Sequence, residues 1–177
     1  MIKIDINEER IFENRKVHGE RIRKNQDKYY WAVEIPIKKH NKSLYNKIKG
    51  KNILEIGCST GKDAKYYVNH CSFYFGIDIS DEAIKKAISL NLKNSDFLCA
   101  DGHIIPKQDN EFDCVIVNGL LHHLDLERVS KEIHRVLKPK GILIFREPLG
   151  INPFFKFIGN LHLMLEHLLS GPLQLRI

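Results

Sequence analysis

One stretch of the chain, Asn52 to Asp63, constrains the fold more than any other. It reads NILEIGCSTGKD, an apolar run followed by a turn of small residues and then by helix-compatible sequence. An apolar run of this kind is typical of a buried parallel strand. A strand, a small-residue turn and a helix together direct free backbone N–H groups at a ligand. The stretch therefore predicts a ligand-binding turn at the carboxyl end of a parallel strand.

The spacing within this turn argues against two common ligand classes. A P-loop needs two glycines five positions apart, followed by Lys and a hydroxyl residue. Here Gly57 and Gly61 are four apart, and Asp63 stands in the hydroxyl position. The dinucleotide fingerprint needs a small residue where Lys62 stands, because helix and strand pack closely there. What remains is an acid followed by small residues at alternate positions, namely Glu55, Gly57, Ser59 and Gly61.

Strand and helix signals alternate after this turn. Helices are expected from Asp63 to Val68, after a Ser80 cap, and from Leu124 to Leu137. The expected strands are the run at Ile53–Ile56 and the segments Ser72–Ile79, Asp96–Ala100, Phe112–Asn118 and Ile142–Arg146. Such alternation predicts an α/β fold, a Rossmann-like parallel sheet with helices on both faces and right-handed crossovers.

The carboxyl ends of the five expected strands all carry polar or small residues. They are Glu55-Ile56-Gly57, Asp78, Asp101-Gly102, Asn118-Gly119 and Glu147-Pro148. Open α/β sheets bind their ligands outside these ends. Asp78 lies 17 residues after Gly61, so one crossover helix can bring its carboxylate beside the turn, where it can accept hydrogen bonds from a ribose diol. The simpler alternatives are a helix-capping acid at Asp78 and an ordinary loop acid at Asp101.

Composition bounds the class of protein. The 177 residues, 43% of them hydrophobic, suit one globular domain with a sizeable core. No apolar run approaches the roughly 20 residues of a membrane span, and the charged N-terminus MIKIDINEER lacks a signal core, so we expect a cytoplasmic protein. The four cysteines show no CxxC pairing, and neither a metal site nor a disulfide framework is expected.

Positive charge is concentrated in the N-terminal segment. Up to Lys51 the chain carries 14 Lys/Arg against 7 Asp/Glu, whereas the remainder carries 14 against 15. A basic arm can attract an acidic substrate, nucleic acid or a membrane surface. A solvated helical face is the simpler interpretation, and the interspersed acids make a nucleic-acid partner unlikely.

Several segments together resemble one enzyme family. The acid and alternate small residues of the turn resemble the cofactor loop of class I S-adenosylmethionine-dependent methyltransferases. EIHRVLKPKGILIFREP is similar to the turn and fifth strand of the ubiquinone/menaquinone-biosynthesis type, and NGLLHHL is similar to the segment after its fourth strand. The resemblance covers roughly Asn52 to Pro148 and implies S-adenosylmethionine as the cofactor.

The resemblance also implies which residues bind that cofactor. In the family, the acid ending the second strand (here Asp78) binds the ribose, and the acid after the third strand (here Asp101) binds the adenine amino group. Backbone after the fourth strand contacts the methionine end. The full expected set is Glu55, Gly57, Cys58, Ser59, Gly61, Asp78, Ile79, Asp101, Gly102, Asn118 and Gly119.

Two histidines after the fourth strand are the candidate catalytic residues. The methyl group of S-adenosylmethionine is already activated, so placement matters most, and a base helps a hydroxyl or acidic-carbon acceptor. His122 and His123 can supply that base, with His123 preferred; the alternative is that both only support the next helix. Family members that methylate planar amino groups carry Asn/Asp-Pro-Pro-aromatic here, which NGLLHH lacks. O- or C-methylation of a small molecule is therefore favoured.

The chain departs from the family pattern at two positions and at its end. Ser59 and Lys140 stand where the family usually has glycine, and the Cβ of Ser59 predicts weaker cofactor binding. Only 31 residues follow Arg146, with apolar residues at helical spacing from Phe154 to Leu168. We expect a helical tail in place of the family's last two strands. The open edge of the fifth strand then favours self-association or a partner.

Three segments are expected from these patterns. Residues 1–50 form a basic helical cap or lid, 51–148 the S-adenosylmethionine-binding core, and 149–177 the apolar tail. Within the first, Asn7 is expected to cap a helix reaching towards Lys24, and Ser43 a short helix ending at Gly50. Because the short C-terminus removes a region that often contacts substrate, a catalytically inactive S-adenosylmethionine-binding or scaffold protein is the alternative function.

Overall fold

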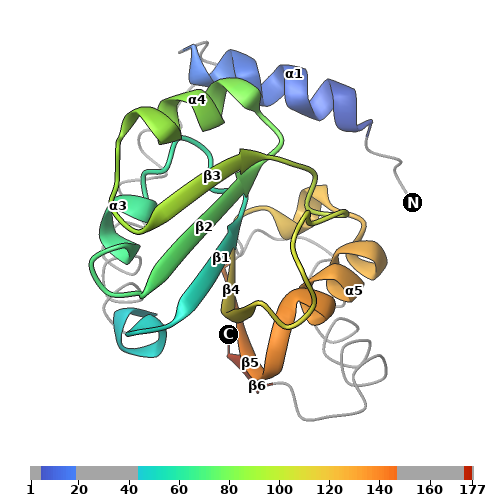
Figure 1. Cartoon of the computed structure of the whole chain (residues 1–177). Helices are drawn as coiled ribbons and strands as arrows, with labels where there is room; N and C mark the ends of the chain where they lie inside the picture. Colours follow the sequence, from blue (N-terminus) through green and yellow to red (C-terminus); the bar gives the residue numbers. More distant parts are fainter. Residues whose placement is uncertain (1–4, 19–43, 147–173, 177) are drawn as a thin grey trace.

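A parallel sheet organises the computed structural model, which describes residues 5–18, 44–146 and 174–176 (Figure 1). Its order is β3-β2-β1-β4-β5-β6, and every neighbouring pair is parallel. The chain steps outward from β1 in one direction through β2 and β3, and in the other through β4 and β5. The order therefore reverses between β1 and β4, the place where α/β sheets bind ligands at their carboxyl ends. The strands are β1 (Asn52–Ile56), β2 (Phe73–Asp78), β3 (Ser95–Cys99), β4 (Phe112–Asn118), β5 (Leu137–Arg146) and β6 (Gln174–Arg176).

Helices cover both faces of the sheet. Residues 44–48 are also helical, and Leu44 and Ile48 are buried. One hydrophobic cluster joins α5 to β1, β4 and β5, and a second joins residues 44–48, α3 and α4 to the opposite face. The helices are α1 (Ile6–Val17), α3 (Ala64–Tyr67), α4 (Asp81–Ser89), the short 3-10 helix η1 (Leu121–His123) and α5 (Leu126–Val136). The expected Rossmann-like α/β fold, with its five strands in order, is confirmed.

The alternation of side chains along β1 explains the two clusters. Leu54 and Ile56 pack in the α5 cluster, whereas Ile53 packs in the cluster on the other face. Successive side chains of a strand point to opposite faces, so this strand is buried on both. Glu55 shares the face of Ile53, which places a carboxylate inside an otherwise apolar layer.

Several element boundaries differ from the expected ones. The first helix is capped by Asp5, whose side chain accepts from the Asn7 N–H, so the cap lies two residues before the expected one. Strand β5 begins at Leu137, five residues earlier than expected, because the chain already pairs with β4 at Phe112. Ser80 caps α4 as expected, by accepting from the Ala83 N–H. The helix expected from Phe154 to Leu168 lies outside the described residues.

The β5 edge carries one strand that the sequence analysis did not predict. Strand β6 pairs in parallel with Ile142, Leu143 and Ile144 of β5. The expectation that β5 is the open edge strand is thus wrong over these three residues. Self-association through this edge and the tail remains a prediction, which light scattering can test. Within the described ranges, no helix is long and apolar enough to cross a bilayer.

Two hydrogen bonds connect helix α1 to α4. Helix α1 lies against α4 (Figure 1), and none of its residues is buried. Asn14 donates from Nδ2 to Asp81 Oδ1 at 2.9 Å, and Lys86 Nζ donates to the Val17 carbonyl at 2.6 Å. These contacts hold α1 at the carboxyl end of β2, because α4 follows that strand directly.

The turn before the apolar part of β5 offers a stability test. Lys140 is exposed and has a φ of 67°, a left-handed conformation that costs a non-glycine residue about 1 kcal/mol or more. We predict that Lys140→Gly raises the free energy of unfolding by about 0.5–1 kcal/mol in chemical denaturation. The same change at Lys131, exposed within α5, is the matched control and should destabilise by about 1 kcal/mol. Equal destabilisation by both changes would contradict the proposed strain.

Candidate functional site

The turn between β1 and α3 is held against the end of β2 by backbone hydrogen bonds. The N–H groups of Gly57 and Cys58 both donate to the Ile77 carbonyl, at 2.8 and 3.0 Å. The Gly61 N–H donates to the Cys58 carbonyl at 3.0 Å, which closes the turn. Three residues of the turn have positive φ: Gly57 at 79°, Ser59 at 49° and Gly61 at 72°. A serine therefore occupies one of three positions that favour glycine.

Asp78 joins this turn to the start of α4. Its Oδ2 accepts from the Ser59 N–H at 2.8 Å, and its Oδ1 accepts from the Ser80 N–H at 2.9 Å. Burial raises the pKa of Asp78, and these two hydrogen bonds oppose that rise. Each carboxylate oxygen keeps a second lone pair for a ligand donor. As the spacing predicted, the structure brings Asp78 beside the turn.

The two glycines of the turn are required by the chain's own packing. A Cβ on Gly57 would lie 2.7 Å from Leu120 Cδ2. A Cβ on Gly61 would lie 3.0 Å from Leu90 Cδ1 and 3.2 Å from the Ala87 Cβ. The sequence analysis explained small residues here by the approach of a ligand alone. The structure adds a second reason: Gly57 packs against the β4–α5 connection, and Gly61 packs against α4 and the residue after it.

Four other expected residues take different positions around the turn. The Cys58 side chain is buried, and burial raises its pKa, so it presents backbone to the site rather than a thiolate. Ile79 is half-buried directly after Asp78. A Cβ on Gly102 would lie 2.9 Å from Ile56 Cγ2, whereas one on Gly119 would meet no atom within 4 Å. Gly119 thus borders open space at the carboxyl end of β4.

Asp101 lies beyond the end of β3, next to Asp78. The Ala100 N–H donates to the Asp78 carbonyl at 3.0 Å, which holds the start of this loop against β2. Asp101 Oδ1 accepts from the His103 N–H at 2.9 Å and contacts the His103 ring at Nδ1 at 2.6 Å. The two aspartates therefore follow adjacent strands, as their positions in the sequence predict.

Glu55 lies beneath the site and not on its surface. It is 2% exposed, and its Oε2 accepts from the Tyr74 hydroxyl at 2.6 Å while Oε1 accepts from Asn118 Nδ2 at 3.1 Å. Asn118 Nδ2 also lies 3.4 Å from Asp63 Oδ2 and 3.4 Å from the Tyr67 hydroxyl. The sequence analysis missed the two tyrosines and Asp63, since nothing in their spacing shows that they converge on Glu55.

The candidate histidines begin the connection from β4 to α5. Both belong to η1, and the side chain of His122 lies outside the described structure. His123 is 35% exposed, and its Nδ1 lies 3.5 Å from Glu9 Oε1 of α1. Helix α1 therefore contacts both sides of the sheet edge, α4 through Asn14 and η1 through Glu9. No sequence pattern links Glu9 to His123, and the sequence analysis missed this contact. Among the described residues, no group of three or more acids, histidines or cysteines could hold a metal ion.

The buried Glu55 predicts a pH-dependent stability. Burial, and to a smaller extent the Asp63 carboxylate, raise the pKa of Glu55 to about 8, against hydrogen bonds from Tyr74 and Asn118. Since the ordinary value is 4.5, the folded state binds the proton more tightly than the unfolded state. The stabilisation is complete below pH 4.5 and is lost as the pH rises through 8, at about 1.4 kcal/mol per pH unit at most.

Glu55→Gln removes this titration and keeps the side-chain shape. We expect the free energy of unfolding of the variant, relative to the wild type, to increase between pH 5 and pH 8 (about one to several kcal/mol) in chemical denaturation. Glu127→Gln, in an exposed i,i+4 pair with Lys131, is the matched control and should show an almost constant difference. A pH-independent difference for Glu55→Gln would show that the carboxylate is ionised in the fold.

Comparison with known proteins agrees with this geometry. A family model described as "Methyltransferase domain" matches residues 54–145. The chain is 34% identical over 132 residues to the uncharacterized protein MJ1252 of Methanocaldococcus jannaschii, covering 73% of this chain and 50% of that protein. It is 30% identical over 102 residues to the ubiquinone biosynthesis O-methyltransferase of Coxiella burnetii, covering 55% of this chain and 44% of the relative. The chain thus spans about half the length of these relatives.

A solved structure shares the same fold. The crystal structure of the [4+2]-cyclase SpnF is 29% identical and superposes with a TM-score of 0.55, over 61% of this chain and 44% of that one. The family match covers more than half of the chain, including part of β1, all of β2, β3 and β4, and nearly all of β5. The resemblance described from the sequence is therefore confirmed, and the chain belongs to the methyltransferase domain family of S-adenosylmethionine-dependent enzymes.

Proposed function

We propose that this protein transfers a methyl group from S-adenosylmethionine to a small-molecule acceptor. The observation that carries the proposal is the Asp78 carboxylate, which ends β2 and bonds the Ser59 N–H of the turn. The residues at this edge fit a nucleoside, because two carboxylates follow adjacent strands and Gly119 leaves open space beside them. S-adenosylmethionine supplies a methyl group already activated on a sulfonium.

Each side chain at the edge has a proposed task. Asp78 accepts hydrogen bonds from the ribose diol, for which its oxygens have free lone pairs. Asp101 accepts from the adenine amino group. The turn from Gly57 to Gly61 places its backbone close to the cofactor, and Gly119 places backbone on the opposite side of the site. Glu55 supports both sides from below, since it bonds β2 through Tyr74 and β4 through Asn118.

Proton removal from the acceptor is assigned to His123. The Glu9 carboxylate near Nδ1 favours the tautomer with the proton on that nitrogen, which makes Nε2 the basic nitrogen. This contact also supports α1 as the cover that excludes water from the reacting groups. If His123 is the base, His123→Gln lowers methyl transfer from labelled cofactor about 100-fold or more and leaves cofactor binding unchanged. Equal loss of binding and transfer would instead indicate a structural role.

The acceptor class rests on this chain's own residues. Relatives include both an O-methyltransferase and a phosphoethanolamine N-methyltransferase, so membership of the family does not select among oxygen, carbon and nitrogen. The segment NGLLHH lacks the Pro-Pro-aromatic pattern that suits planar amino groups and supplies histidine bases instead. We therefore propose a hydroxyl or an acidic carbon as the methylated atom.

A second function is favoured by one comparison. The SpnF structure shares this fold and is described as a cyclase. The alternative is thus a protein that binds S-adenosylmethionine without transferring its methyl group, acting as a scaffold or in other chemistry. Both functions predict cofactor binding, and only the first predicts label transfer to molecules of a small-molecule extract.

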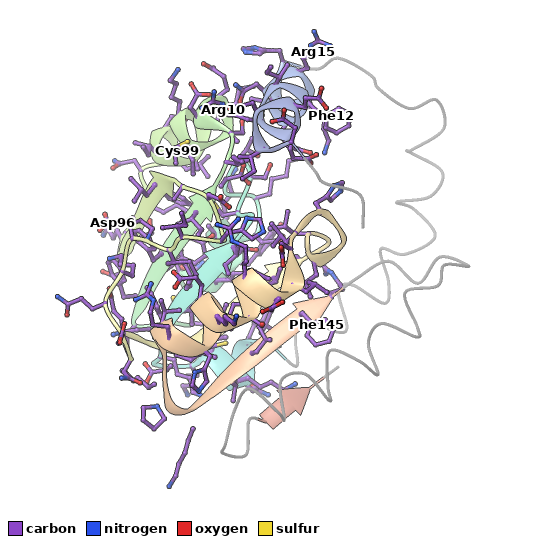
Figure 2. The ribbon with its side chains drawn as sticks, turned by 90° about the vertical axis from the view of Figure 1, so that its right-hand side faces the viewer. Arg10, Phe12, Arg15, Asp96, Cys99 and Phe145 are labelled. Atoms are coloured by element: carbon purple, nitrogen blue, oxygen red, sulfur yellow. The ribbon has the colours of Figure 1, made fainter. Side chains whose placement is uncertain are left out.

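Calorimetric titration tests the site directly. We expect binding of S-adenosylmethionine and S-adenosylhomocysteine, and no heat with NAD or ATP. Asp78→Asn should weaken S-adenosylhomocysteine binding about tenfold to a hundredfold, because a charged acceptor is lost. Asp96→Asn changes the same charge, and Figure 2 shows Asp96 towards the opposite end of β3 from Cys99. This control should bind like the wild type, and an unchanged dissociation constant in folded Asp78→Asn would remove Asp78 from the site.

A further inference from the structure

His103 is buried between the β3 loop and the start of α5. Its side chain is 7% exposed, and its Nδ1 lies 2.6 Å from Asp101 Oδ1. The same oxygen accepts the His103 backbone N–H at 2.9 Å. Nε2 of the ring accepts the Asp125 N–H at 2.9 Å. The ring thus connects two loops that flank the carboxyl end of the sheet.

These contacts define the protonation of the ring. A nitrogen that accepts a hydrogen bond carries no proton, so Nε2 is bare and Nδ1 carries the proton of the neutral ring. The bond to Asp101 is therefore an N–H donated to a carboxylate. Asp125 is held in turn, because its side chain caps α5 by accepting from the Glu127 and Arg128 N–H groups at 3.1 and 3.3 Å.

Asp101 is left with unequal oxygens. Oδ1 accepts two hydrogen bonds from His103, whereas Oδ2 has no hydrogen-bond partner among the described residues. The loop that carries Asp101 and His103 cannot shift freely, because Gly102 packs closely against Ile56. A Cβ on Gly102 would lie 2.9 Å from Ile56 Cγ2. The carboxylate is 24% exposed, so it remains accessible to a ligand.

We propose that His103 is a positioning residue that sets the base specificity of the cofactor site. By holding Oδ1, it fixes the carboxylate plane of Asp101 and reserves Oδ2 as an acceptor for the 6-amino group of adenine. A 6-oxo purine would place a carbonyl against that oxygen and be rejected. The inference rests on the proposed cofactor site and assigns the selection of its base to a side chain that touches no ligand.

Two conservative substitutions of His103 test the two hydrogen bonds of its ring one at a time. His103→Asn keeps an N–H donor near the place of Nδ1 and loses the acceptor for Asp125. His103→Gln reaches the place of Nε2 and loses the donor to Asp101. The measurement is the dissociation constant of S-adenosylhomocysteine and of S-inosylhomocysteine for each folded variant, together with the melting temperature.

We expect the wild type and His103→Asn to prefer the adenine ligand by tenfold or more, and His103→Gln to lose most of that preference. Asp125→Ala is the matched control for a purely structural effect. It removes the α5 cap, so it should lower the melting temperature and leave the base preference unchanged.

The outcomes distinguish this inference from the proposed function. If the wild type binds neither ligand, the proposed cofactor site is wrong. If it binds S-adenosylhomocysteine without preferring adenine, or if His103→Gln keeps the full preference, the positioning role is overturned. Loss of preference in His103→Asn with retention in His103→Gln would likewise overturn it, since the Asp125 bond would then be the one that matters.

Discussion

The hydrogen bond from the Ser59 N–H to the Asp78 carboxylate joins the turn after β1 to the last residue of β2. Strands β1 and β2 are neighbours in the sheet and both end at this point. Strand β1 leads into the turn, and Asp78 is the last residue of β2. Because Asp78 also accepts the Ser80 N–H, one side chain sets both the shape of the turn and the start of α4. Burial disfavours the charge on this carboxylate and raises its pKa, and two backbone donors offset part of that cost. A ligand donor that reaches it meets an acceptor already oriented.

The architecture was predictable because the sequence carries it locally. The apolar runs of β1 and β4 and the Ser80 cap each lie within a few neighbouring residues, and parallel topology follows from their alternation. The placement of Asp78 beside the turn was predictable for a related reason, since the crossover rule brings strand ends to one edge. The local pattern predicted the wrong N-cap for the first helix, which is Asp5 and not Asn7.

The contacts that complete the site depend on residues far apart in the chain. His103 and Asp125, Glu9 and His123, and Glu55 with Asn118 are separated by 22 residues or more, and no periodic pattern joins them. Glu55 was expected at the ligand, yet its burial follows from strand alternation combined with the position of Tyr74 on β2. The structural reason for glycine at position 57 could not be predicted either, because it is the contact with Leu120 in the β4–α5 connection.

The hydrogen bonds between α1 and α4 have a consequence for local opening of the structure. Since none of its residues is fully buried, detaching this helix exposes less apolar surface than opening the core, and it exchanges hydrogen bonds to the protein for hydrogen bonds to water. We therefore expect α1 to detach locally, at a lower free-energy cost than global unfolding.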